Sequence, residues 1–139
     1  MTTYIADTNI IIRLLVKDDE AQFDATVRAL TELERRGEVC LVPDVVWLES
    51  CWVLEKVYKL QRSDIANALT DLMLTEVFRP MSDFVRELLA EYARTTIDPI
   101  DLYLSSFSVN TGHPVLTWNH KDFRKLGCEW ITPDRMPAG

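Results

Sequence analysis

The chain has 139 residues, 47% of them hydrophobic, and a formal net charge of -7. This length fits one ordinary domain, which can bury a sufficient core without disulfides or structural metals. The acidic balance argues against a protein that coats DNA regardless of sequence, but it permits a local grip on a short nucleic-acid segment. No apolar run approaches the roughly 20 residues of a membrane span, and no signal-peptide pattern opens the chain. We therefore expect a cytoplasmic protein that does not contact membranes.

Short β-rich segments alternate with longer helical segments along the chain. This alternation predicts an α/β fold with three layers, α/β/α, around a central, mostly parallel sheet of about four to five strands. We expect a single domain over residues 1–133 and a loose tail over residues 134–139. The expected strands are residues 3–7, 39–42, 76–79, 115–118 and 130–132, and the expected helices begin near Asp7, Asp19, Pro43, Ser63, Ser82 and Asp98. The side chains of Asp19, Ser63 and Ser82 are expected to cap their helices.

Acidic side chains recur close to the ends of the expected strands. Asp7 lies at the carboxyl end of the first strand, Asp98 and Asp101 open the helix that precedes the fourth strand, and Asp122 follows that strand. Ligands of open α/β sheets bind at the carboxyl ends of the strands. Carboxylates gathered there repel one another unless a cation joins them, and a hard divalent ion such as Mg²⁺ or Mn²⁺ prefers oxygen ligands. Taken singly, Asp7 and Asp98 are also ordinary helix caps.

Glu49 is the most informative acid, because its helical neighbours are apolar. Val45, Val46, Trp52 and Val53 lie three or four residues from it. This spacing predicts that Glu49 lies within an apolar helix face, where an unpartnered ionised side chain is costly to bury. Either a metal ion or an ion pair with an arginine would explain it.

Other side chains give weaker signals. Lys121, Arg124 and Lys125 gather after the fourth strand, where they are expected to face solvent or to contact phosphates. The cysteines lack the spacing of a metal site and are expected to be reduced thiols. No glycine-rich phosphate loop is present. The tryptophans expected in the core rather than on a base-stacking surface are Trp47, Trp52 and Trp118.

In order and spacing, four segments resemble the PIN domain and, within it, the VapC-type toxins of bacterial toxin-antitoxin pairs. They are residues 5–11 around Asp7, residues 47–50 around Glu49, residues 98–102 around Asp101, and residues 116–123, which contain Asn119 and Asp122. The resemblance covers essentially the whole chain.

The resemblance implies an endoribonuclease that depends on one or two Mg²⁺ or Mn²⁺ ions, with Asp7, Glu49 and Asp101 matching the family's principal acids. It also implies an RNA substrate, a cognate antitoxin with a basic segment, and a tendency to form homodimers. Thr8 and Thr117 are expected to orient ligands or water, and Asp98 to support them or to act as a further ligand.

One position departs from the family pattern, because Asn119 stands where the family commonly has aspartate. The fourth metal ligand is then either Asn119 or Asp122. A different class of function also fits the acidic residues, since a non-catalytic interaction module could use an acidic pocket to bind a basic protein partner.

Overall fold

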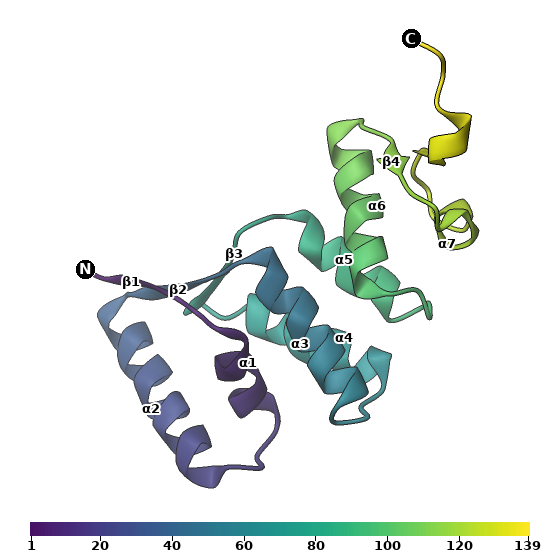
Figure 1. Ribbon diagram of the computed structural model, residues 1–139. Helices are drawn as coiled ribbons and strands as arrows, with labels where there is room; N and C mark the ends of the chain where they lie inside the picture. Colours follow the sequence, from purple (N-terminus) through teal and green to yellow (C-terminus); the bar gives the residue numbers. More distant parts are fainter.

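A computed structural model describes residues 1–139 and has an α/β fold in which helices outnumber the short strands (Figure 1). The strands are β1 (Thr3–Ile5), β2 (Val39–Val42), β3 (Phe78–Pro80), β4 (Val115–Leu116) and β5 (Trp130–Ile131). The helices are α1 (Thr8–Leu15), α2 (Glu20–Arg36), α3 (Asp44–Lys56), α4 (Arg62–Met73), α5 (Phe84–Tyr92), α6 (Pro99–Thr111), α7 (His120–Arg124) and the short 3-10 helix η1 (Pro133–Arg135).

All strand pairs are parallel, so the predicted α/β class with a parallel sheet is confirmed. The strands form two sheets, one in the order β1-β2-β3 and the other β4-β5. In the first sheet Tyr4 lies opposite Cys40, and in the second Val115 lies opposite Trp130. Consequently β1 and β4 each have one unpaired edge. In Figure 1, β4 and α7 lie beside α6, away from β1.

Helix caps explain several element boundaries. As predicted, Asp19 caps α2 by accepting a hydrogen bond from the Gln22 amide at 3.0 Å. Glycine 37 ends α2 with a φ of 70°, a left-handed conformation that glycine adopts without strain. Two predicted caps were wrong. Helix α4 begins before Ser63, because its cap is Gln61. Ser82 donates its hydroxyl to Asp44, 3.0 Å away, and so does not cap α5.

Helix α3 forms the centre of the core. Its side chains Trp47, Cys51 and Leu54 are fully buried, and the helix packs against α1, α4 and α6. The expectation of a buried tryptophan is confirmed for Trp47 only. Trp52 lies on the outer face of α3 and is 51% exposed, and Trp118 lies beyond β4 and is 68% exposed. None of the helices combines the length and apolar character needed to cross a bilayer.

An ion-pair network holds the segment that leads into α6. Arg62 donates to Glu55 at 3.0 Å and to the Ile97 carbonyl at 2.7 Å, and its guanidinium lies 4.3 Å from the centre of the Tyr92 ring. Tyr92 also donates to Glu55, at 2.8 Å. Burial alone would raise the pKa of Glu55, but the hydrogen bonds from Tyr92 and Arg62 hold it below its usual value. Because Ile97 immediately precedes Asp98, this network fixes the start of α6.

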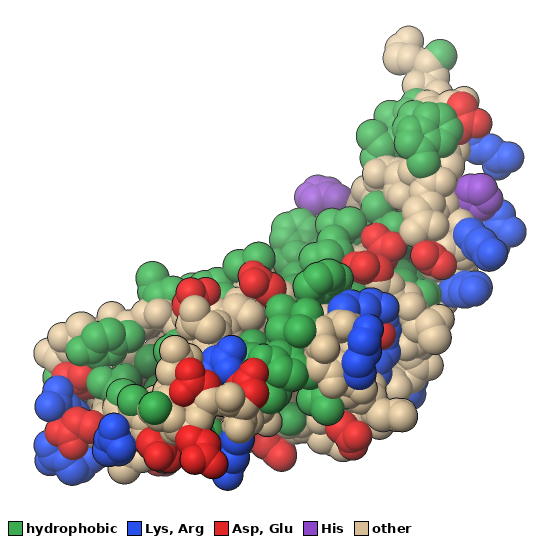
Figure 2. Space-filling model, turned by 60° about the horizontal axis from the view of Figure 1, so that its bottom comes forward, with side chains coloured by type: hydrophobic (Ala, Val, Ile, Leu, Met, Phe, Trp, Pro, Cys, Tyr) green, Lys and Arg blue, Asp and Glu red, His purple; other side chains and the backbone are tan.

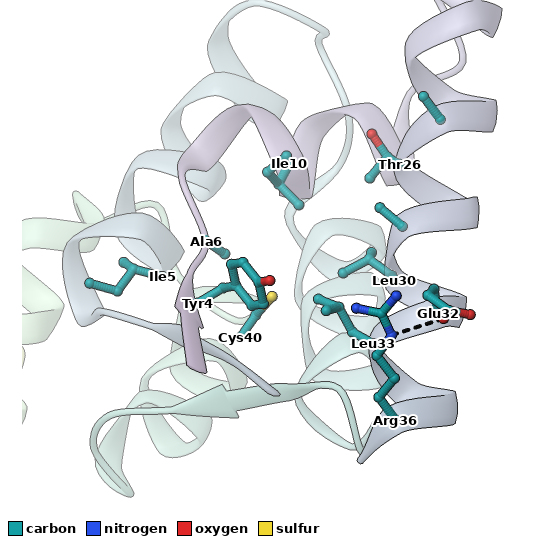
Figure 3. A pocket seen from close by; sticks show the side chains of 12 residues that line it. Tyr4, Ile5, Ala6, Ile10, Thr26, Leu30, Glu32, Leu33, Arg36 and Cys40 are labelled. Carbon is teal, nitrogen blue, oxygen red and sulfur yellow. Dashed lines mark hydrogen bonds and ion pairs between the residues drawn. The ribbon is translucent and has the colours of Figure 1, made fainter. Parts of the chain in front are cut away.

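An apolar groove of about 540 Å³ separates β1 from α2 (Figure 3). Tyr4 and Cys40 line its sheet side, and Leu30 and Leu33 line its helix side. Helix α2 has no buried residue, although apolar side chains point from it into the groove. The groove therefore leaves the face of α2 that points toward the sheet incompletely packed.

Candidate functional site

Acidic side chains meet where α6 and α7 begin. The Asn119 side-chain nitrogen donates to one oxygen of Asp101 and one oxygen of Asp122, each at 3.0 Å. Asp98 caps the same end of α6 by accepting a hydrogen bond from the Ile100 amide at 2.8 Å, as predicted. We call Asp98, Asp101, Asn119 and Asp122 the acidic cluster. The fold thus joins two residues, Asp101 and Asn119, that lie 18 positions apart in the sequence.

The electrostatics of this cluster act most strongly on Asp101. Burial raises the pKa of its carboxyl, and the charges of Asp98 and Asp122 raise it further. The hydrogen bond from Asn119 acts in the opposite direction without cancelling them. The raised pKa of Asp101 reflects burial first and the charges of two neighbouring carboxylates second, and a bound cation would relieve the repulsion between these carboxylates.

Local packing sets the geometry of α7. Thr117, just beyond β4, accepts a hydrogen bond from the Asn119 amide at 2.9 Å, which fixes the turn into the helix. Phe123 is buried and anchors α7. The neighbouring Asp122 carboxylate accepts a hydrogen bond from the side-chain nitrogen of Asn119.

Asp7 lies two residues beyond β1, at the carboxyl end of the strand, as predicted. Its carboxylate accepts hydrogen bonds from the Thr8 amide at 2.7 Å and from the Asn9 side chain at 3.3 Å, and Asp7 caps α1. Asp7 is exposed, whereas Thr8 is 6% exposed. The carboxylate is accessible from solvent, but no other acid of the predicted site contacts it.

Glu49 does not occupy the buried face that its neighbours suggested. It is exposed, as are Val45 (63%) and Trp52 (51%) on the same side of α3. No ion pair or hydrogen bond joins its carboxylate to another side chain. The prediction of a buried Glu49 was wrong because the helix turns Val46, Trp47 and Ser50 inward instead, which leaves an apolar stripe facing solvent.

The predicted metal ligands therefore lie in two groups. Asp101, Asn119 and Asp122 are joined in the acidic cluster, whereas no hydrogen bond joins Asp7 or Glu49 to it. No three carboxylate, imidazole or thiolate side chains lie close enough together to hold an ion between them. The oxygen donors of the acidic cluster suit a hard divalent cation, but they supply only part of a complete ligand set.

Basic side chains lie next to the acidic cluster. Lys121 and Arg124 are exposed on α7, and Lys125 follows directly. None of them takes part in an ion pair. Figure 2 shows Lys and Arg side chains along one edge of the C-terminal end, with acidic side chains beside them. A pocket that no sequence pattern indicated lies beside α7 and is lined by His120, Trp130 and Arg135.

Three comparisons place the chain among known proteins. The PIN domain family model matches residues 4–127. The VapC ribonuclease of Aquifex aeolicus (strain VF5) is 25% identical over 130 residues, which cover 93% of this chain and 96% of the relative. The crystal structure of VapBC2 from Rickettsia felis bound to a promoter DNA fragment covers 94% of this chain and 98% of that chain, with 17% identity and a TM-score of 0.38. Because the family model spans most of its length, the chain belongs to the PIN domain family.

Proposed function

We propose that this chain is a Mg²⁺- or Mn²⁺-dependent endoribonuclease and the toxin of a toxin-antitoxin pair. The acidic cluster is the observation that carries the proposal, because it gathers carboxylates whose charge is not compensated, beside a basic surface. Membership of the PIN domain family and the similarity to a protein named VapC ribonuclease support it. Residues 1–133 would act as one nuclease domain.

In this proposal, the chain binds one or two ions through oxygen ligands. A bound divalent ion would supply an activated water and would stabilise charge on the phosphate. In the structure Asn119 directs its nitrogen at both carboxylates. For Asn119 to bind an ion, its side-chain amide would have to rotate so that the oxygen faces the ion. If the amide keeps its orientation, Asp122 is the fourth ligand. The proposed ligands are Asp7, Glu49 and Asp101 with Asn119 or Asp122, supported by Thr8, Thr117 and Asp98.

A complete ligand set requires Asp7 to approach the acidic cluster. Pairing the free edges of β1 and β4 in parallel would achieve this, since the carboxyl ends of parallel strands lie at the same edge of a sheet. Asp7 lies two residues beyond β1, and Asn119 lies three residues beyond β4. Both edges now expose apolar side chains, with Ile5 74% and Leu116 59% exposed, which pairing would cover.

The substitution Ile5→Lys tests this requirement. Because Ile5 is exposed, the metal-free variant should unfold with a free energy within about 0.5 kcal/mol of the original protein. The charged side chain should nevertheless hinder strand pairing and reduce RNA cleavage at least tenfold. Urea titrations and cleavage assays measure the two effects.

Leu74→Lys is the matched control, because Leu74 is 63% exposed at the end of α4, away from both strand edges. It should change neither stability nor cleavage. If Ile5→Lys destabilised the metal-free protein much more than Leu74→Lys does, Ile5 would already be covered. Unchanged cleavage by Ile5→Lys would mean that the site works without pairing of the strands.

The surroundings of the acidic cluster suit an RNA strand and a protein inhibitor in different ways. Lys121, Arg124 and Lys125 are placed to contact phosphates on either side of a scissile bond. The net charge of -7 favours binding of a basic antitoxin segment across the acids. We place the protein in the cytoplasm, as a homodimer, and its unbridged cysteines fit that reducing compartment.

The direct test is RNA cleavage by the purified protein with Mg²⁺, with Mn²⁺ and with EDTA. Cleavage should stop in EDTA and return when Mn²⁺ is added in excess, because all proposed ligands are oxygen donors. Undiminished cleavage in EDTA would refute the dependence on metal.

A second function is favoured by one observation, namely that Asp7 and Glu49 do not meet the acidic cluster. A non-catalytic module that binds a basic protein partner would need no assembled ligand set. Tight binding of a basic partner, combined with no cleavage of any RNA pool in Mn²⁺, would favour this function over the nuclease.

A further inference from the structure

A pocket of about 280 Å³ opens on the C-terminal part of the chain, among residues of α7, β5 and η1. Trp118 and Trp130 supply its aromatic surface, and Arg124 and Arg135 supply its positive charge. These residues come from the end of β4, from β5, from α7 and from η1. The pocket is therefore built by one compact segment and does not depend on the position of β1.

The aromatic rings of the pocket present flat faces. His120 and Trp130 stack with their ring centres 6.1 Å apart and their planes 29° from parallel. Trp118, on the same pocket, is 68% exposed and packs in no core. Such a large exposed ring contributes nothing to folding by burial, whereas a nucleic-acid base can stack on it.

The charges of the pocket also suit a nucleic acid. Arg124 and Arg135 are exposed and take part in no ion pair, in a protein whose net charge is -7. Asp134 is the one acid that lines the pocket. Two unpaired guanidinium groups beside aromatic faces are the combination that binds phosphates and stacked bases of single strands.

The pocket and the acidic cluster share the same short helix. Trp118 immediately precedes Asn119, and Arg124 follows Asp122 by two residues. A base held in the pocket would therefore lie against the same short helix that carries Asp122. The arrangement positions a strand relative to the scissile phosphate rather than binding it at random.

We propose that this pocket receives one unpaired RNA base, stacked on Trp118 and Trp130, with Arg124 and Arg135 on the adjoining phosphates. The proposal rests on the nuclease function proposed above, for which it names the subsite that sets the register of the RNA strand. Trp118 and Trp130 are positioning residues in this account, since they contact the substrate away from the reacting phosphate.

The test measures binding of a short 2′-O-methyl RNA, which cannot be cleaved by attack of its own 2′-oxygen, by fluorescence anisotropy in EDTA. Trp118→Ala should weaken binding about 5- to 140-fold, the equivalent of losing one base stack. Trp118→Phe should retain most of the affinity. Because the side chain is 68% exposed, the alanine variant should keep its melting temperature.

The contribution of charge has its own control. Arg124→Ala should weaken binding and reduce its dependence on salt, because one phosphate contact is lost. Arg28→Ala removes an exposed arginine of α2 that also takes part in no ion pair, and it should leave binding unchanged. Equal effects of the two substitutions would show that net charge alone attracts the RNA. That result would overturn the proposal that the pocket binds RNA.

The outcomes separate this proposal from the nuclease function. If the protein cleaves RNA but Trp118→Ala binds the oligonucleotide unchanged, the pocket is refuted and the function stands. If Trp118→Ala loses binding but the original protein never cleaves RNA, the pocket stands and the function fails. If Trp118→Ala changes only the sedimentation of the protein, the pocket is a protein interface and the proposal is overturned.

Discussion

Asp101→Asn should reduce RNA cleavage at least about a hundredfold, the lower end of what removing one electrostatic group from an active site costs. The same substitution should make the metal-free protein less sensitive to rising pH. Burial and the charges of Asp98 and Asp122 raise the pKa of Asp101 in the folded chain. The folded state therefore holds this proton more tightly than the unfolded state. The Asp101 contribution to stability is lost as pH rises from the ordinary value of 3.8 through the raised one.

Asparagine cannot ionise, so Asp101→Asn should gain stability relative to the original protein as pH rises from 3 to 8. Asp64→Asn is the matched control, because Asp64 holds the same position in the first turn of α4 that Asp101 holds in α6. Both substitutions lose the same favourable interaction with a helix dipole, about 0.3–1 kcal/mol. Across this pH range, the melting temperature relative to the original protein should rise more for Asp101→Asn than for Asp64→Asn. Identical pH profiles would remove the electrostatic argument for the acidic cluster.

Arg62→Ala should lower the free energy of unfolding by about 3 kcal/mol, the lower end of the range for breaking a buried ion pair. The lower end applies because the pair is not completely buried: the side chains of Arg62 and Glu55 are 13% and 20% exposed. The substitution also removes the hydrogen bonds to the Thr95 and Ile97 carbonyls, which hold the segment before Asp98. Cleavage should fall as well, because the start of α6 carries Asp101.

Arg36→Ala is the control for that experiment. It breaks a pair with Glu32 in which the two side chains are 50% and 40% exposed, and such a surface pair contributes at most about 1 kcal/mol. Denaturant titrations compare the two variants directly. If Arg62→Ala cost no more than Arg36→Ala, the network around Arg62 would not hold the start of α6 as described.

The parts of the fold that local chemistry determines were predictable from the sequence. The cap at Asp19, the end of α2 at Gly37 and the Asp98-Pro99 start of α6 follow from side-chain hydrogen bonds and backbone freedom within a few residues. Predicted helix boundaries were wrong where a side chain bonds to a residue far away in the sequence and not to its own helix. Ser82 is a good cap by type, but its hydroxyl donates to Asp44, 38 positions away.

The candidate site was also predictable only in part, because some of its features depend on tertiary contacts. The sequence placed Asp101 and Asp122 near each other, because both lie near the carboxyl end of β4, and the structure brings them together through Asn119. Glu49 could not be placed, since periodicity identifies an apolar helix face but not whether another element covers it. The pocket around Trp118 and Trp130 was missed for a similar reason. Its two rings lie 12 positions apart, and only the pairing of β4 with β5 joins them.

The chemical ends of the RNA products test the central claim most directly. If water attacks the phosphate at the acidic cluster with a divalent ion bound, and the 3′-oxygen leaves and takes up a proton, each cut should leave a 5′-phosphate and a 3′-hydroxyl. The measurement is end-group analysis of RNA cleaved by the purified protein in Mn²⁺, with Asp101→Asn as the blank. A 5′-phosphate that is absent from the blank is the predicted result. Products with a 5′-hydroxyl and a cyclic phosphate would mean that the RNA's own 2′-oxygen attacked, which would contradict the proposed mechanism.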